Sequence, residues 1–220
     1  MTEAITLDVC DLLHQVSVER AVKKAIDDTI KDGNEHAVVV CKDGWIYHTK
    51  GSPKTIKGDI LSKMFSDCNN EVSLDFHTHP LGVGYPSIND LMADTYYNPE
   101  HDCVWGKIDN KIRCYKGKGE VAELGKKRRE LYNEWKALYE KYKNSTGEER
   151  EKYAEQIHKI VNLYNYLKHR ERYLITKEYK GKTPEDVTPS KPFSGKYVDI
   201  YEPDCPLDNI LPKLTIPDSD

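Results

Sequence analysis

The chain has 220 residues, of which 38% are hydrophobic and 32% are charged. A chain of this length can bury a hydrophobic core without the support of disulfides or structural metals. Its 33 basic and 37 acidic residues give a net charge of −4, which argues against a general nucleic-acid binder because that class usually carries a basic surplus. The mean hydropathy is −0.75, and the apolar runs are far shorter than the ~18–20 residues of a membrane-spanning helix. The first residues show no secretion signal, so we expect a cytoplasmic protein without membrane segments.

Six cysteines are spread along the chain, and none form a Cys-x-x-Cys pair. Neither a cysteine zinc site nor a thioredoxin-type redox motif is therefore expected. Reduced thiols are the default for a cytoplasmic chain. Cys103 and Cys114 fall on two strands expected to be neighbours, but we do not predict a bridge between them.

Hydrophobic periodicity predicts alternating helices and strands in the first 118 residues. Apolar residues at steps of three and four predict a helix over 18–30, and Asp32-Gly33-Asn34 ends it. The other expected elements are strands over 36–41 and 45–49, a helix over 56–65, a strand over 72–79, a helix from residue 87, and strands over 103–107 and 111–115. Residues 1–118 thus predict a domain of the α/β (α+β) class.

Two further segments follow this domain. Residues 119–180 are dense in charge and tyrosine, and their helical spacing predicts a helical hairpin. Its basic residues alternate with glutamate, which favours a solvated outer face over a nucleic-acid surface. Its apolar stripe is expected to pack on the core or between the two helices, or else to serve as a protein partner or dimer surface. Residues 181–220 hold seven of the eleven prolines and predict an extended tail, draped over the domain or lying in a substrate groove.

A pattern that predicts metal chemistry begins at the end of the strand over 72–79. His77 and His79 are two residues apart, so their imidazoles project from one face and can reach one ion. Ser87 then opens a helix, and Asp90 in its first turn can complete a His₂Asp set. Three protein ligands with an open position are typical of catalytic zinc. Each half of the pattern is weak evidence alone, but the combination predicts a metal site.

The spacing His77-Thr78-His79, seven residues, Ser87, two residues, Asp90 resembles the signature of the JAMM (MPN-plus, JAB-type) zinc metallopeptidases. A proline after the second histidine and another before the serine are also similar to that family. The resemblance covers about half of the chain. It implies the JAB/MPN-like fold, a mixed β-sheet flanked by helices in a cytidine-deaminase-like layering.

The resemblance implies a role for each matching residue. His77, His79 and Asp90 would bind Zn²⁺. Asp94, one helical turn later, is an alternative ligand that the family spacing disfavours. Asp75 shares the histidines' face, as a partner for an imidazole or as a solvent-facing residue.

Two catalytic roles complete the implied site. Ser87 would donate a hydrogen bond to the developing oxyanion. The family takes its general base, a glutamate, from an earlier strand, and Glu35 fits that place because it directly precedes the apolar run 36–41. Glu19 and Glu71 fit less well, since one lies in the first helix and the other begins the histidine strand.

The implied reaction is hydrolysis of an amide bond. In this family the bond is often the isopeptide that joins a lysine to the C-terminus of a ubiquitin-like protein, and some prokaryotic relatives are linked to sulfur-carrier proteins. The short loop after the second histidine departs from the eukaryotic deubiquitinating members. Two alternatives stay open: a catalytically silent MPN-type interaction protein, and a RadC-like protein that uses the basic hairpin on nucleic acid.

Overall fold

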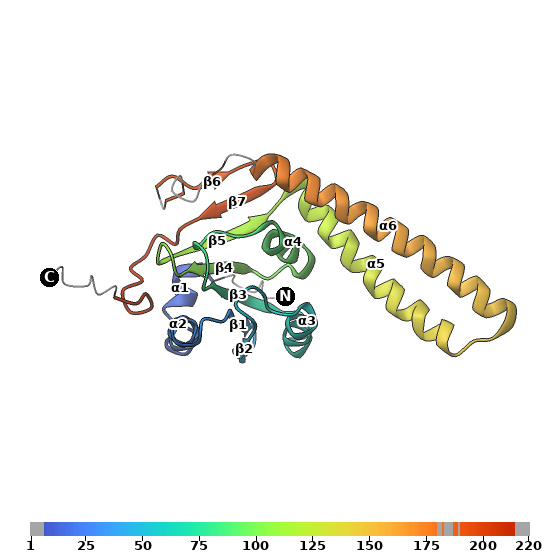
Figure 1. Ribbon diagram of the computed structural model, residues 1–220, viewed down its shortest axis with the longest axis horizontal. Coiled ribbons are helices and arrows are strands. Elements are labelled where there is room, and N and C mark those ends of the chain that lie inside the picture. Colours follow the sequence, from blue (N-terminus) through green and yellow to red (C-terminus); the bar gives the residue numbers. More distant parts are fainter. Residues whose placement is uncertain (1–6, 180–181, 183–186, 189, 214–220) are drawn as a thin grey trace, which may run out of the picture.

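The computed structural model describes residues 7–179, 182, 187–188 and 190–213. Its centre is a mixed sheet of seven strands in the order β2-β1-β3-β4-β5-β7-β6 (Figure 1). The strands are β1 (His36–Cys41), β2 (Ile46–Lys50), β3 (Val72–His79), β4 (His101–Gly106), β5 (Lys111–Gly117), β6 (Phe193–Ser194) and β7 (Val198–Tyr201). The predicted α/β (α+β) class is confirmed at this level.

The pair β3 and β4 is parallel, whereas the other neighbours in the sheet are antiparallel. A parallel pair requires a crossover connection. Helix α4 (Ile88–Tyr97) supplies it, between the end of β3 and the start of β4. The sheet topology therefore brings the first turn of α4 next to the C-terminal end of β3.

One face of the sheet is covered by α1 (Val9–Leu13) and α2 (Val16–Asp32) (Figure 1). The stripe predicted for the first helix is buried and packs on apolar residues of β1 and β3, including Phe76. Helix α2 ends at Gly33, whose φ of 72° lies in the left-handed region that glycine adopts without strain. The predicted helix over 18–30 is confirmed, and it extends two residues further at each end.

The opposite face is covered by α3 (Gly58–Asp67), by α4 and by the base of a helical hairpin. Phe65 of α3 packs against Val39 of β1. Leu91 of α4 and Ile175 of the hairpin pack together above Val104 of β4. The sheet thus forms the middle of three layers, and helices of different origin close its two faces.

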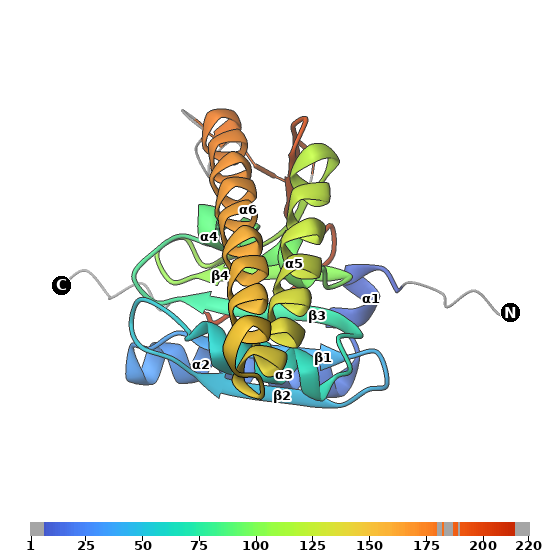
Figure 2. The same cartoon turned by 90° about the vertical axis from the view of Figure 1, so that its right-hand side faces the viewer.

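The hairpin consists of α5 (Gly119–Lys143) and α6 (Gly147–Tyr179), which project beyond the sheet (Figures 1 and 2). A buried ion pair holds its base, in which Arg128 Nε lies 2.7 Å from Glu171 Oε2. The guanidinium also donates to the carbonyl of Met92 at 3.0 Å, and the Thr95 hydroxyl donates to Glu171. These contacts fasten the hairpin to α4. No helix in the described ranges has the length and apolarity needed to cross a membrane.

The C-terminal segment adds two strands that the sequence did not predict. Strand β7 pairs with β5, and its Val198 and Ile200 are fully buried. The apolar alternation of Val198–Tyr201 is short and lies among prolines, so the composition of the segment predicted an irregular extended tail and no strand. None of the described residues after Gly117 lines the pocket beside β3, so the tail placed in the structure does not occupy that pocket.

All six cysteines are paired in disulfides, namely Cys10–Cys205, Cys41–Cys68 and Cys103–Cys114. The expectation of reduced thiols is therefore wrong. Cys103 and Cys114 face each other directly across β4 and β5. The Cys10–Cys205 bridge joins residues 195 positions apart, a proximity that depends on the return of the tail to α1 and that local sequence cannot show.

Candidate metal centre

Strand β3 presents different chemistry to the two faces of the sheet. Leu74 and Phe76 are fully buried under α2, and Thr78 bonds to Thr29 of that helix. Asp75 and His77 alternate with them and therefore face the other way, toward α4. The period of two in the sequence thus separates the core from the candidate site.

The imidazoles of His77 and His79 converge with the carboxylate of Asp90. The two Nε2 atoms are 3.0 Å apart, and Asp90 Oδ2 lies 3.2 Å from His77 Nε2 and 3.3 Å from His79 Nε2. A tetrahedral zinc site with bonds of ~2.0–2.1 Å places its ligand atoms about 3.3 Å from one another. The residues fit a zinc ion, since two nitrogen donors and one oxygen donor form a triangle of the required size.

Hydrogen bonding selects the tautomer that metal binding needs. His79 Nδ1 lies 3.1 Å from the carbonyl oxygen of Val83, which can only accept, so Nδ1 carries the hydrogen. The lone pair of His79 is therefore on Nε2, the atom that faces His77 and Asp90. Such a carbonyl partner is the usual outer contact of a metal-binding histidine.

Electrostatics in the absence of an ion support the same arrangement. Burial opposes a charge on His77, but the Asp90 carboxylate outweighs it and raises the pKa of His77 to about 9. Burial likewise opposes the charge of Asp90, while the two imidazoles hold its pKa well below the usual range. Protons thus supply the positive charge that a divalent ion would supply, and metal binding must displace them.

Ser87 and Asp90 form a capping box at the start of α4. Ser87 Oγ accepts from the Asp90 amide at 3.0 Å, and the Ser87 amide donates to Asp90 Oδ2 at 2.8 Å. The cap fixes the carboxylate that meets the two histidines. Because the Ser87 hydroxyl accepts in this bond, its own hydrogen is not used by the cap and can be donated toward the exposed side of the site.

Glu35 lies just before β1 and lines the same pocket, whose volume is about 310 Å³. Its backbone pairs with Ser52 and Gly51, with N···O distances of 2.9 and 2.8 Å, so its position is fixed by the strand ladder. Burial raises the pKa of its half-buried carboxyl, against the opposing influence of His77 and His79. A raised carboxyl pKa suits a group that takes up and returns a proton near neutral pH.

The alternative glutamates lie elsewhere. Glu19 of α2 pairs with His14, which lies between α1 and α2, at a separation of 3.8 Å, and Glu71 is exposed just before β3. Neither lines the pocket that contains the histidines. Asp94, the alternative ligand, turns toward β5, where it accepts from the Gly117 amide at 2.8 Å. The structure therefore brings Glu35 and Asp90 to the site and leaves the three alternatives away from it.

A row of buried polar groups lies behind the metal ligands, and Asp75 is the member of it that the sequence singled out. Asp75 is 6% exposed and Asp102 is 2% exposed, and the two are opposite each other on β3 and β4. Tyr115 follows as the partner of Asp102 on β5. Asp75 is thus buried rather than solvent-facing. Alternation along β4 would have placed Asp102 on this face, but nothing in the sequence shows which strand lies beside β3.

Burial determines the protonation of this row. It raises the pKa of Asp75 to about 7, although His77 acts in the opposite direction. Burial, with the neighbouring carboxylates, raises the pKa of Asp102 well above the ordinary range. The pocket therefore contains acidic groups that hold protons near neutral pH, next to a carboxylate at Asp90 that stays charged.

No model of a known protein family matches the sequence, and no curated protein matches it either.

Proposed function

We propose that the chain is a zinc-dependent metallopeptidase or isopeptidase of the JAMM (MPN-plus) type, with a JAB/MPN-like catalytic domain. The observation that carries this proposal is the convergence of His77, His79 and Asp90 within 3.3 Å of one another, in the pocket that Glu35 lines. Three ligands leave one position of a tetrahedral ion open, which is typical of catalytic rather than structural zinc.

The reaction is hydrolysis of an amide bond. His77, His79 and Asp90 would hold the zinc ion, and the chemistry it would supply when bound is a lowered pKa, about 7, for a water molecule. Glu35 accepts a proton from the attacking water and returns it to the leaving amine, so one carboxyl serves as base and then as acid. Ser87 donates its free hydroxyl hydrogen to the oxygen that becomes negative as the carbonyl is attacked.

A larger cleft adjoins the pocket and supports a protein substrate. Its volume is about 770 Å³, and it lies between the hairpin and the helices α3 and α4. Asn89 and Tyr97 line both the cleft and the metal pocket. Arg172 of α6 donates to Asn89 at 2.9 Å, next to Asp90. The hairpin thus forms a wall along the approach to the site, where a chain bearing the scissile bond can lie.

We propose an isopeptide or peptide bond at the C-terminus of a ubiquitin-like or sulfur-carrier protein as the substrate class. The cleft carries basic side chains from the hairpin, among them Lys136 and Lys168. Changing Lys168 to Glu is expected to raise KM while leaving kcat unchanged, because the residue lines the cleft and does not line the metal pocket. Lys152→Glu, on the same helix outside the cleft, is the matched control; an equal effect of both would contradict a substrate role for the cleft.

The three disulfides bear on the compartment. Disulfides persist in oxidising compartments and also inside hyperthermophilic cells, and they are rare in the cytosol of mesophiles. We propose that the protein works where its disulfides persist, and a cytoplasmic location holds only for a cell of the hyperthermophilic kind.

Zinc analysis combined with a hydrolysis assay tests the function. The wild-type chain is expected to bind zinc and to cleave at least one member of a panel of isopeptide-linked and peptide-linked ubiquitin-like conjugates. His79→Ala is expected to lose one zinc equivalent and all turnover. A wild-type chain that binds no zinc at His77, His79 and Asp90 would overturn the proposal in favour of a silent interaction protein.

A further inference from the structure

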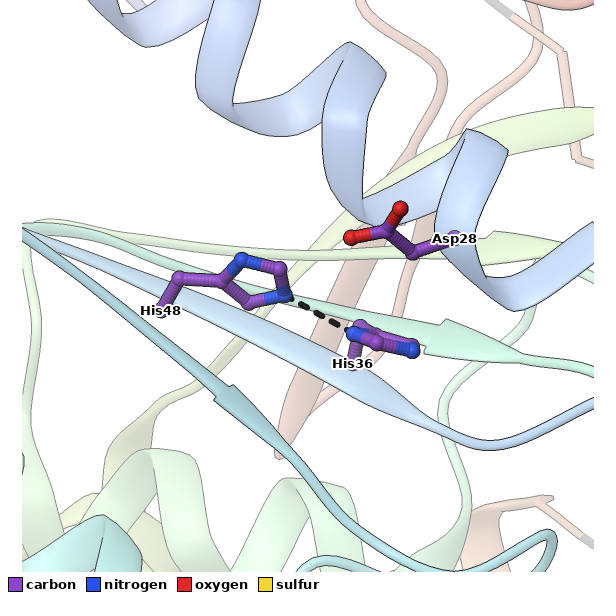
Figure 3. A group of neighbouring side chains, drawn as sticks. All are labelled: Asp28, His36 and His48. Carbon is purple, nitrogen blue, oxygen red and sulfur yellow. Dashed lines mark hydrogen bonds between the residues drawn. The ribbon is translucent and has the colours of Figure 1, made fainter. Parts of the chain in front are cut away.

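A second group of metal-binding side chains lies on the other face of the sheet, at its edge. Asp28 comes from α2, His36 from β1 and His48 from β2 (Figure 3). One ligand atom from each lies within 4.8 Å of the others. From this juxtaposition we propose that Asp28, His36 and His48 form a second zinc site, separate from the candidate catalytic centre.

The two imidazoles already face each other in the way that a shared ion requires. His36 Nδ1 and His48 Nε2 are 2.8 Å apart, and both rings project from neighbouring strands toward α2 (Figure 3). In the strand register His48 is opposite Val38, two residues from His36, so the histidines are diagonal neighbours on one face. This separation resembles the 3.0 Å between the Nε2 atoms of His77 and His79.

A fourth residue fixes the tautomer of His36. Its Nε2 lies 3.0 Å from Asp32 Oδ2, one helical turn after Asp28. An ionised carboxylate only accepts, so His36 Nε2 carries the hydrogen, and Nδ1 presents its lone pair toward His48. A carboxylate behind a histidine is the outer contact that orients metal-binding imidazoles and raises their basicity. Asp32 thus fixes the tautomer of His36, as the Val83 carbonyl fixes that of His79.

The second site is buried on the side of His36 and open to solvent on the side of His48. The His36 side chain is 4% exposed and that of Asp28 is 29% exposed, whereas His48 lies at the surface. An ion can therefore enter from solvent. The charged neighbours are Lys24, which contacts Asp28 Oδ2 at 2.5 Å, and Lys50, 4.0 Å from Asp32 Oδ2. Contact with Lys24 engages one carboxylate oxygen, and the other is available to a metal.

The donor set indicates both the ion and its role. Two imidazole nitrogens and one carboxylate oxygen suit zinc better than calcium or magnesium, which prefer oxygen ligands. An ion here connects a helix with two strands, including β2 at the edge of the sheet. Its effect should therefore be structural, because binding to the folded chain alone stabilises that state. Glu35 directly precedes His36, so the same ion would also anchor the strand entry that positions the candidate base.

Zinc stoichiometry in the full chain tests this site independently of the first one. A His77→Ala/Asp90→Ala chain, with the first site disabled, is expected to retain one zinc in equilibrium dialysis and to show a higher melting temperature with zinc. Adding His48→Ala should abolish both effects. Asp32→Asn should weaken binding about 10- to 100-fold, because Asp32 orients a ligand without contacting the ion.

The surface position of His48 makes its replacement a mild one, and His14→Ala, which removes another exposed histidine, serves as the matched control. If the first-site variant does not fold, wild type and His48→Ala are compared instead, with the variant expected to bind one zinc fewer. Equal zinc content in wild type and His48→Ala would overturn the second site. A zinc that survives His77→Ala/Asp90→Ala supports it even where the proposed function fails.

Discussion

The two faces of β3 differ in chemistry, since one is apolar and the other carries titratable groups. Toward α2 the strand places Leu74 and Phe76 in a closed apolar core. Toward α4 it places Asp75 and His77 in a polar pocket. The same eight residues therefore stabilise the fold on one side and prepare a reactive site on the other. The site therefore depends on the core, since buried titratable groups cost stability that apolar burial must offset.

The apolar face should give the largest stability effect. Phe76→Ala is expected to lower the free energy of unfolding by ~3–5 kcal/mol, because the ring is fully buried and its loss leaves a cavity. Chemical denaturation measures this change. Ile108→Ala removes a side chain that is 70% exposed, and a change of less than about 0.5 kcal/mol is expected. Similar losses of unfolding free energy in both variants would contradict the role of the α2-facing side of β3 as the core.

The pocket face depends on the hairpin through α4. Glu171→Ala leaves Arg128 buried without its charge partner, so a loss of about 3 kcal/mol in unfolding free energy is expected. The exposed pair of Arg170 and Glu120 on the same hairpin, 2.6 Å apart, offers a matched control. Glu120→Ala should cost less than about 1 kcal/mol. Equal costs by denaturation would show that the buried pair does not hold the hairpin to α4.

Ser87 has both a structural and a catalytic role, and substitution can separate them. Ser87→Ala is expected to lower kcat about 100-fold, corresponding to about 2.7 kcal/mol of transition-state stabilisation, because the oxyanion loses a donor. It should also cost about 1 kcal/mol of stability through loss of the cap. Ser87→Thr keeps the hydroxyl and should restore most of the turnover. A threonine variant as slow as the alanine variant would contradict the donor role.

The buried carboxyl of Asp102 should make the free energy of unfolding depend on pH. Burial raises the pKa of Asp102 in the folded state above its value in the unfolded chain. Its favourable contribution is therefore fully present below the unfolded pKa and is lost as pH rises through the folded pKa. Asp102→Asn avoids this loss, so the stability of the variant relative to wild type should rise between pH 5 and pH 8.

Denaturation at the two pH values measures the difference for Asp102. Asp208→Asn, which alters an exposed carboxylate, should stay within about 0.5 kcal/mol of wild type at both. An Asp102→Asn variant that loses stability relative to wild type as pH rises would show that this carboxyl is not costly to the fold.

The sequence predicted the parts of this comparison that depend on local pattern. Alternation along 72–79 predicted which residues of β3 share a face, and the serine cap predicted that Asp90 lies in the first turn of α4. The sequence alone therefore predicts the contrast between the two faces of β3. What local pattern could not supply was the order of the strands, and hence the row from Asp75 through Asp102 to Tyr115.

Long-range contacts account for the remaining differences. Strand β7 becomes a strand only because β5 offers it a free edge. The Cys10–Cys205 bridge requires both ends of the chain to return to the same corner. His36 and His48 look like ordinary strand residues until the register of β1 and β2 puts them diagonally together beneath Asp28. Each of these features arises from pairing between distant segments.

The most direct test of the central claim separates metal binding from proton transfer. Glu35→Gln preserves the size of the side chain and leaves His77, His79 and Asp90 intact, so it should keep its full zinc content. Its kcat on a cleaved conjugate is expected to fall ~10²–10⁴-fold, because glutamine cannot accept the proton. Glu71→Gln, at an exposed position, is the matched control and should keep wild-type turnover. A Glu35→Gln variant that retains zinc and full turnover would contradict the account.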